Sequence, residues 1–209
     1  MKVLQELIRR HPSLVGCEES FRIAYGMLLD CYQSGGKVLV CGNGGSAADA
    51  DHIAGELLNK FKKKRAIDPN IAEQLPREVV DKLVGALPAI SLVAMSAAVS
   101  SISNDSCWDV AFAQQVYGLG NKGDVLLTIS TSGNSVNCIN AAHVAKAMGL
   151  RVVALTGEDG GALAKLSDVA IRVPERETFR IQELHLPIYH ALCAALEDAL
   201  FQDKPTQNE

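Results

Sequence analysis

Short apolar runs alternate with helical patterns along most of this chain, and this alternation constrains its fold more than any other feature. Runs typical of buried strands occupy residues 37–41, 89–94, 124–129, 151–155 and 168–173. Helical patterns lie between them, at 47–58, 108–119 and 136–148, and a last one covers 178–201. Strands that alternate with helices pair in parallel, and the helices cover both faces of the sheet. The sequence therefore predicts an α/β fold, a three-layer sandwich around a five-stranded parallel sheet.

Two amphipathic helices are expected before the first strand, in an N-terminal helical segment over residues 1–35. Residues 64–88 interrupt the alternation, and Pro76 can open a short helix over 77–84 there. We interpret this segment as an inserted flap near the ligand site, or equally as a subunit contact. The chain fits a single domain over residues 1–209, with a polar tail after Asp203 that is expected to fray.

The composition argues against several classes of protein. A net charge of −4 gives no reason to expect nucleic acid as a partner, and the basic cluster at 60–65 is interpreted as a solvated helix end. No apolar run has the length of a membrane span, and the N-terminus has no signal-peptide core. The six cysteines lack metal-finger and redox spacing, and Cys31, Cys41 and Cys193 are expected in the core. We therefore expect a cytoplasmic, reduced protein without a membrane partner.

The segment Ile129-Ser130-Thr131-Ser132-Gly133-Asn134-Ser135 joins a strand to a helix and is rich in hydroxyl groups. Backbone N–H groups, hydroxyl donors and the helix dipole favour a bound anion at such a turn, above all a phosphate. The turn has no lysine, so it is not a nucleotide-binding P-loop and suits a phosphorylated small metabolite better. The alternative is an ordinary polar turn with a serine N-cap.

A second turn, Gly42-Asn43-Gly44-Gly45-Ser46, follows the first strand. In parallel sheets, ligands bind beyond the carboxyl ends of the strands, where both turns are expected. On the helix that follows, His52 and Glu56 are four residues apart and share one face. Such a pair can bind a divalent metal or transfer protons, although it is also common on solvated helices.

Polar side chains also line the last helix, where Gln182, Leu186 and His190 form a ladder with a spacing of four residues. They are candidates for a site, and the alternatives are surface solvation or a satisfied core histidine. Pro187 is expected to kink this helix and so to change the direction of His190. The pair Asn104-Asp105, after a serine-rich stretch, is predicted to form a turn that binds sugar hydroxyls or, equally, caps a helix near Trp108.

Together these residues resemble the SIS (sugar isomerase) domain and, within it, the phosphoheptose isomerases. The resemblance covers about the whole chain. It rests on residues 41–46 with His52 and Glu56, on Asn104-Asp105, and on residues 129–135, 155–161 and 180–183. It implies a five-stranded parallel α/β sandwich and the conversion of sedoheptulose 7-phosphate to D-glycero-D-manno-heptose 7-phosphate, which feeds bacterial surface-heptose synthesis.

The resemblance also implies a role for each matching residue. The phosphate would be held by Ser130, Thr131, Ser132 and Ser135, and the sugar would be lined by Asn43, Gly44, Gly45, Glu56, Asn104, Asp105 and Gln182. Glu56 and His190 would be the catalytic acid–base pair, and zinc would be bound by His52, Glu56, Gln182 and His190. Members of the family are homotetramers with active sites at subunit interfaces, so Gln182 and His190 would act on a neighbouring subunit's ligand.

Two features depart from the family pattern. Residues 64–88 are longer than the usual loop, which bears on the identity of the substrate, and Pro187 is unusual in the last helix, which bears on His190. The strongest alternative function is a non-enzymatic adaptor that binds the replication initiator, but that pattern lacks counterparts of Glu56 and His190. An isomerase of another sugar phosphate and a sugar-phosphate sensor are further alternatives, the latter without a visible DNA-binding motif.

Overall fold

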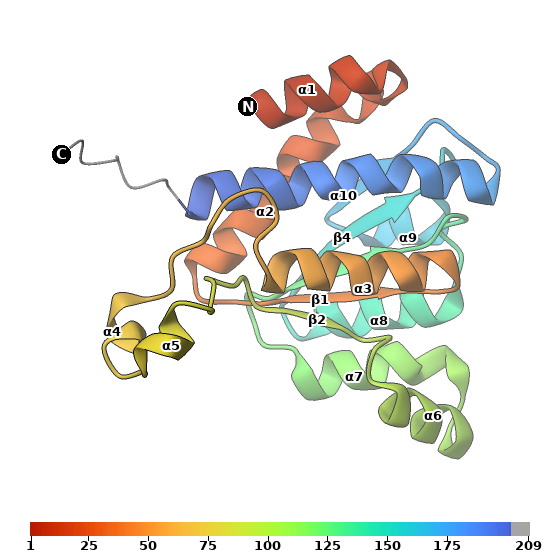
Figure 1. Ribbon diagram of the computed structural model, residues 1–209. Coiled ribbons are helices and arrows are strands. Elements are labelled where there is room, and N and C mark those ends of the chain that lie inside the picture. Colours follow the sequence, from red (N-terminus) through yellow and green to blue (C-terminus); the bar gives the residue numbers. More distant parts are fainter. Residues whose placement is uncertain (202–209) are drawn as a thin grey trace.

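The computed structural model describes residues 1–201 and contains a five-stranded, all-parallel sheet in the order β2-β1-β3-β4-β5 (Figure 1). The strands are β1 (Val38–Gly42), β2 (Ala89–Ser91), β3 (Val125–Ile129), β4 (Arg151–Thr156) and β5 (Val169–Arg172). The predicted sheet is confirmed, and most strand bounds differ from the expected ones by one or two residues. The edge strand β2 is shorter than predicted, because its pairing with β1 ends at Ser91.

Helices cover both faces of the sheet, and each face has its own apolar core. Alternate residues of a strand point to opposite faces, so Val38 and Val40 lie in one core while Leu39 and Cys41 lie in the other. The first core is closed by α1 (Lys2–Arg10), the 3-10 helix η1 (Pro12–Cys17), α2 (Glu18–Gln33), α3 (Gly45–Leu58) and α10 (Thr178–Leu200). The second is closed by α7 (Ala111–Leu119), α8 (Val136–Ala147) and α9 (Gly161–Leu166). The predicted three-layer sandwich is therefore confirmed.

The last helix, α10, is one continuous helix that contains Pro187 (Figure 1). The residue therefore does not end the helix, although it removes one backbone donor. The residues after 201, including the tail expected to fray, lie outside the described part of the chain. Among residues 1–201, no helix combines the length and the apolar character that a membrane crossing requires.

The segment between α3 and β2 differs from its prediction in two ways. The basic cluster at 60–65 is not a solvated helix end, because α3 stops at Leu58 and Arg65 is only 1% exposed. Two short helices follow, α4 (Pro69–Ala72) and α5 (Arg77–Val80), and Pro76 precedes the second as expected. Both helices lie beyond the C-terminal end of α3, where the strands begin (Figure 1). They are therefore remote from the carboxyl ends of the strands, where the two ligand turns are, and so do not lie as a flap over those turns.

The expected turn at Asn104-Asp105 is wrong. These residues are the last two of a helix, α6 (Ser96–Asp105), and Cys107 is the N-cap of the 3-10 helix η2 (Trp108–Val110) that follows. The helix predicted from Trp108 to Leu119 consists of η2 and α7 in succession. No helix was predicted for the serine-rich stretch that forms most of α6, yet serine has only a modest helix penalty, and α6 packs against α7.

Candidate active site

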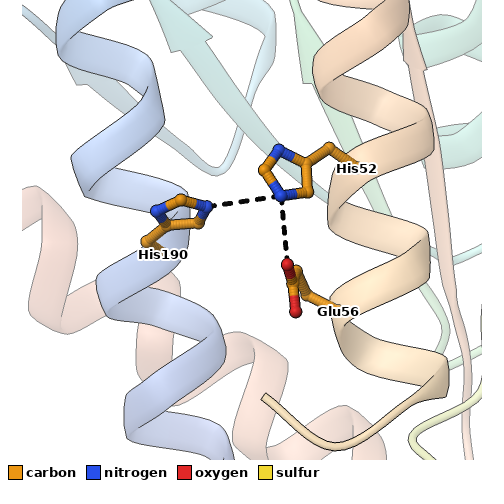
Figure 2. A group of neighbouring side chains, drawn as sticks. All are labelled: His52, Glu56 and His190. Carbon is orange, nitrogen blue, oxygen red and sulfur yellow. Dashed lines mark hydrogen bonds and ion pairs between the residues drawn. The ribbon is translucent and has the colours of Figure 1, made fainter. Parts of the chain in front are cut away.

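Three side chains from two helices, α3 and α10, converge on one point (Figure 2). Nε2 of His52 lies 3.0 Å from Oε1 of Glu56 and 3.5 Å from Nε2 of His190. One potential ligand atom from each residue lies within 4.8 Å of the others. The spacing of four residues places His52 and Glu56 on the same face of α3, and α10 brings His190 opposite them. The tertiary fold thus brings His190 to Glu56 and His52, which precede it by 134 and 138 residues in the sequence.

The cluster is neither deeply buried nor fully exposed. The side chain of His52 is 43% exposed and that of Glu56 is 24% exposed. Burial lowers the pKa of His190, and the neighbouring His52 adds to this effect, while the Glu56 carboxylate opposes it. A lowered pKa favours the neutral imidazole, whose free lone pair can accept a proton or a metal ion.

The donor set of the cluster fits a divalent metal ion. Two imidazole nitrogens and one carboxylate oxygen are a ligand combination that zinc uses in catalytic sites, with a further position left for water or substrate. His52, Glu56 and His190 would be the ligands within one protomer. Gln182 is eight residues before His190, about 12 Å along the helix axis, and its amide lies against Gly45. Within one protomer, Gln182 is therefore separated from the other three predicted zinc ligands.

The phosphate turn (residues 130–135) lies between β3 and α8. The hydroxyl groups of Ser130 and Ser135 are 2.9 Å apart, and Ser132 Oγ accepts the backbone N–H of Asn134. Ser135 is the N-cap of α8, the position that the alternative interpretation gave to a serine, but its side chain makes no capping hydrogen bond. The Ser135 side chain therefore does not occupy the backbone N–H groups at the start of α8. An anion bound at a helix N-terminus needs such groups as donors.

Gly133 and Gly160 hold the phosphate turn against the start of α9. Gly133 has a φ of +66°, and a Cβ atom at this residue would lie 2.0 Å from the carbonyl oxygen of Gly160. The Gly133 carbonyl also accepts the backbone N–H of Leu163. Only glycine meets both the conformation and the close approach at this position.

The glycine-rich turn after β1 lies beside the phosphate turn, because β1 pairs with β3. Asn43 and Asn137 exchange two amide hydrogen bonds of 2.9 and 2.8 Å, which fix the Asn43 side chain. Gly44, with a φ of +57°, is the N-cap of α3, and Gly45 begins the helix against Gln182. The predicted convergence of the two turns at the carboxyl ends of the strands is thus present in the structure.

Asn104 and Asp105 are not brought to either group of residues. Both are exposed at the end of α6, and the Asn104 amide donates to the Asp105 carboxylate at 2.9 Å. A contact with sugar remains a prediction for these two residues.

Sequence reasoning missed four residues that support the cluster. Tyr189 contacts both His52 and Asp49, while Arg65 and Glu197 fix the chain that leaves α3. In the sequence, Tyr189 has no feature that distinguishes it from an ordinary aromatic residue of the core. The spacing of Asp49, His52 and Glu56 at i, i+3 and i+7 was the one available signal, since these positions share a helix face.

Comparisons with known proteins identify the family and show the same fold. The family model described as the SIS domain matches residues 16–157. A phosphoheptose isomerase from Shewanella baltica is 42% identical over 192 residues, which cover 90% of this chain and 88% of that protein. The solved phosphoheptose isomerase of Neisseria gonorrhoeae superposes with a TM-score of 0.73 at 37% identity, covering 94% of this chain and 92% of the other. That of Francisella tularensis gives 0.73 at 33% identity, with coverage of 95% and 100%.

Proposed function

Because this chain belongs to the phosphoheptose isomerase family of SIS-domain proteins, we propose that it interconverts sedoheptulose 7-phosphate and D-glycero-D-manno-heptose 7-phosphate. The observation that carries the proposal is the convergence of Glu56 and His190, from different helices, on one point. An aldose–ketose isomerase needs a base at carbon and a second proton carrier at oxygen, and this pair supplies both. A purely protein-binding adaptor needs neither.

The proposed reaction moves a proton between adjacent carbons through an enediol. The Glu56 carboxylate removes the C1 proton of the ketose, while the neutral His190 takes the proton of the C1 hydroxyl and passes it to the C2 oxygen. Glu56 then returns its proton to C2, which gives the aldose and restores both residues. Zinc bound by His52, Glu56 and His190 would polarise the carbonyl and stabilise negative charge on its oxygen.

The phosphate turn is proposed to bind the substrate's phosphate through Ser130, Thr131, Ser132 and Ser135. The glycine-rich turn, with Asn43, Gly44 and Gly45, is proposed to line the sugar, together with Asn104, Asp105 and Gln182. Two features support the phosphate assignment: the hydroxyl groups of Ser130 and Ser135 meet, and the side chain of the N-cap residue Ser135 caps no backbone N–H of α8. A phosphate held by backbone N–H groups and hydroxyls there also benefits from the helix dipole.

We further propose a homotetramer in which neighbouring subunits complete each site. Along α3, His52 and Glu56 lie about 10 and 16 Å from Gly45, at the phosphate end of the helix. Gln182 is likewise separated from His190 on α10. A substrate anchored at the phosphate turn of one subunit therefore needs residues from another copy to complete the set predicted for one site.

The product is proposed to enter bacterial surface-heptose synthesis from the cytoplasm. All six cysteines are free thiols, and five of them are buried, which suits a reducing compartment.

The first experiment is turnover of sedoheptulose 7-phosphate by the purified protein, measured as isolated, after chelation and after zinc is added back. We expect conversion to the heptose phosphate that is lost on chelation and restored by zinc. Activity that survives complete chelation would contradict the zinc assignment. Failure to convert this substrate in every condition, with turnover of a hexose or pentose phosphate instead, would overturn the substrate assignment.

A further inference from the structure

His52 is held from the side opposite Glu56 by a hydrogen-bonded chain that runs through Tyr189 to Asp49. Nδ1 of His52 lies 3.0 Å from the Tyr189 hydroxyl, which donates to Oδ1 of Asp49 at 3.1 Å. The ring of Tyr189 is 1% exposed and meets the His52 ring edge-on at 5.5 Å. The chain therefore joins two helices through a group that packing already immobilises.

The direction of these hydrogen bonds follows from the number of protons available. A tyrosine hydroxyl has one proton, and an ionised carboxylate only accepts. If Tyr189 gives its proton to Asp49, its oxygen can only accept from His52, so the His52 proton is on Nδ1. Nε2 then has a free lone pair, and this is the atom that faces Glu56 and His190.

A free lone pair at Nε2 leaves three electron-rich atoms facing one another. Nε2 of His52 lies 3.0 Å from the carboxylate oxygen of Glu56 and 3.5 Å from Nε2 of His190, which also offers a lone pair when the His190 proton is on Nδ1. Such an arrangement is unfavourable by itself and is stabilised by a cation among the three atoms. Outer hydrogen bonds to the second nitrogen of a histidine are the usual way in which proteins orient it toward a metal ion.

We propose that Tyr189 and Asp49 are positioning residues that keep the proton of His52 on Nδ1 and so present its Nε2 as a ligand for a divalent cation. Tyr189 acts on His52 directly, and Asp49 acts only by taking the Tyr189 proton. This inference rests on the proposed metal site, but not on the identity of the sugar that the site converts.

Oδ2 of Asp49 supports the assignment. It is buried and has no hydrogen-bond partner in the described part of the chain, so Oδ1 carries the polar contact that the structure gives this carboxylate. Leaving a carboxylate oxygen unpaired in a buried position costs stability, which is typical of a group retained for its effect on a neighbour.

The first test is the affinity of the metal-free protein for zinc ion, measured by competition with a chromophoric chelator. We expect Tyr189→Phe, which keeps the ring and removes the hydroxyl, to weaken zinc binding about 10- to 100-fold. Tyr32→Phe is the matched control, because the Tyr32 hydroxyl is buried without a hydrogen-bond partner among the described residues. It should bind zinc as the unchanged protein does.

Asp49 is tested in the same assay. In Asp49→Ala the Tyr189 hydroxyl is free to donate to Nδ1 of His52, which opposes zinc binding at Nε2, so affinity should fall. Asp49→Asn keeps an oxygen that can accept the Tyr189 proton, so this variant should retain most of the zinc affinity of the unchanged protein. Asp51→Ala is the control on the same helix, since the Asp51 carboxylate accepts from Ser91 at 2.5 Å and does not contact His52.

The double variant, Tyr189→Phe with Asp49→Ala, separates a shared effect from two independent ones. If Asp49 acts only through Tyr189, the double variant should bind zinc no more weakly than Tyr189→Phe alone. Multiplied losses would contradict the proposed order of the chain. Losses in Tyr189→Phe and Asp49→Ala that are no larger than those of their controls would overturn the proposal, as would a parent protein that binds no zinc.

A spectroscopic signature completes the test. In the zinc-loaded protein the Nδ1 proton of His52 should give a slowly exchanging N–H resonance, because it is donated to a buried hydroxyl. This resonance should exchange rapidly or disappear in Tyr189→Phe while the thermal unfolding temperature shows that the protein is folded. Neither readout uses turnover, so a failure of the assigned reaction and a failure of this inference give different results.

Discussion

Arg65 and Glu197 form an ion pair that is closed to solvent, with Nε of Arg65 2.8 Å from Oε1 of Glu197 and both side chains fully buried. The Glu197 carboxylate also accepts the backbone N–H groups of residues 61–63. Arg65 donates to the carbonyl oxygens of Glu56 and Leu57 at the end of α3. The pair therefore fixes the end of the helix that carries Glu56 to the end of α10.

Replacing Glu197 is expected to cost stability rather than to alter the reaction directly. Glu197→Gln leaves the Arg65 guanidinium buried without its counter-charge, which in other proteins costs about 3–5 kcal/mol. We expect a loss of this order in the free energy of unfolding, measured by urea denaturation at neutral pH.

The neighbouring residue supplies the control for this variant. Asp198 is 46% exposed and pairs with Lys63 at 2.7 Å, and surface pairs of this kind contribute about 0–1 kcal/mol. Asp198→Asn should therefore change the unfolding free energy far less than Glu197→Gln. Equal losses of unfolding free energy in the two variants would show that the buried pair stabilises the protein no more than the surface pair does.

His185 is expected to make the protein sensitive to mild acid. Burial lowers its pKa to about 4, although its Nε2 contacts the carbonyl oxygen of Thr156, and its Nδ1 has no partner in the described part of the chain. The unfolded chain binds a proton near pH 6.5, so stability is full above that pH and falls as the pH drops from 6.5 toward 4. The loss attributable to this group is on the order of 3 kcal/mol.

Urea denaturation at a series of pH values between 7.5 and 4 measures this effect. His185→Gln keeps an N–H donor but does not titrate, so its stability should depend less on pH over this range. His143→Gln, at an exposed position of α8, should retain the dependence of the parent protein. A pH dependence in His185→Gln as steep as in the parent protein would refute the assignment.

Glu56→Gln is expected to abolish isomerase turnover without unfolding the protein. The amide cannot act as a base, and general acid–base groups contribute about 10²- to 10⁴-fold to rate. The measurement is kcat for sedoheptulose 7-phosphate, with the thermal unfolding temperature recorded in parallel. Glu73→Gln, at an exposed position after α4, is the control and should keep full activity. Normal turnover by Glu56→Gln would remove Glu56 from the proposed mechanism.

Gly133→Ala is expected to damage the phosphate turn. Its positive φ and the 2.0 Å approach to the Gly160 carbonyl leave no room for a methyl group, so strain of at least about 1–3 kcal/mol is expected. We predict a lower unfolding temperature and a raised KM for the sugar phosphate, measured in a steady-state assay.

Gly118→Ala makes the same chemical change at a permissive position. Gly118 lies inside α7, and a Cβ atom there meets nothing within 4 Å. This variant should gain about 0.4–1 kcal/mol, because alanine restricts the unfolded chain and favours helix. An unchanged KM in Gly133→Ala would argue against phosphate binding at this turn.

The fold and the two ligand turns could be predicted from the sequence because their signals are local. The run Asp124–Ile129 followed by Ser130–Ser135 indicates a strand and a polar turn before a helix from neighbouring residues alone, and the same is true of Cys41–Ser46. The turn predicted at Asn104-Asp105 was wrong because α6 continues through both residues, although serine, asparagine and aspartate are weaker helix formers than alanine. In the same way, Arg65 was placed in a solvated basic cluster because its counter-charge, Glu197, is 132 residues away.

The pairing of distant side chains was decided by the tertiary structure alone. The sequence identified His52, Glu56 and His190 as candidates, but only the packing of α10 on α3 brings the third residue to the other two. The same packing places Tyr189 and Asp49 behind His52 and sets the Gln182 amide against Gly45, at the opposite end of α3 from Glu56. Helical periodicity determines which residues share a face of one helix, whereas the burial of apolar surface between helices determines which faces meet.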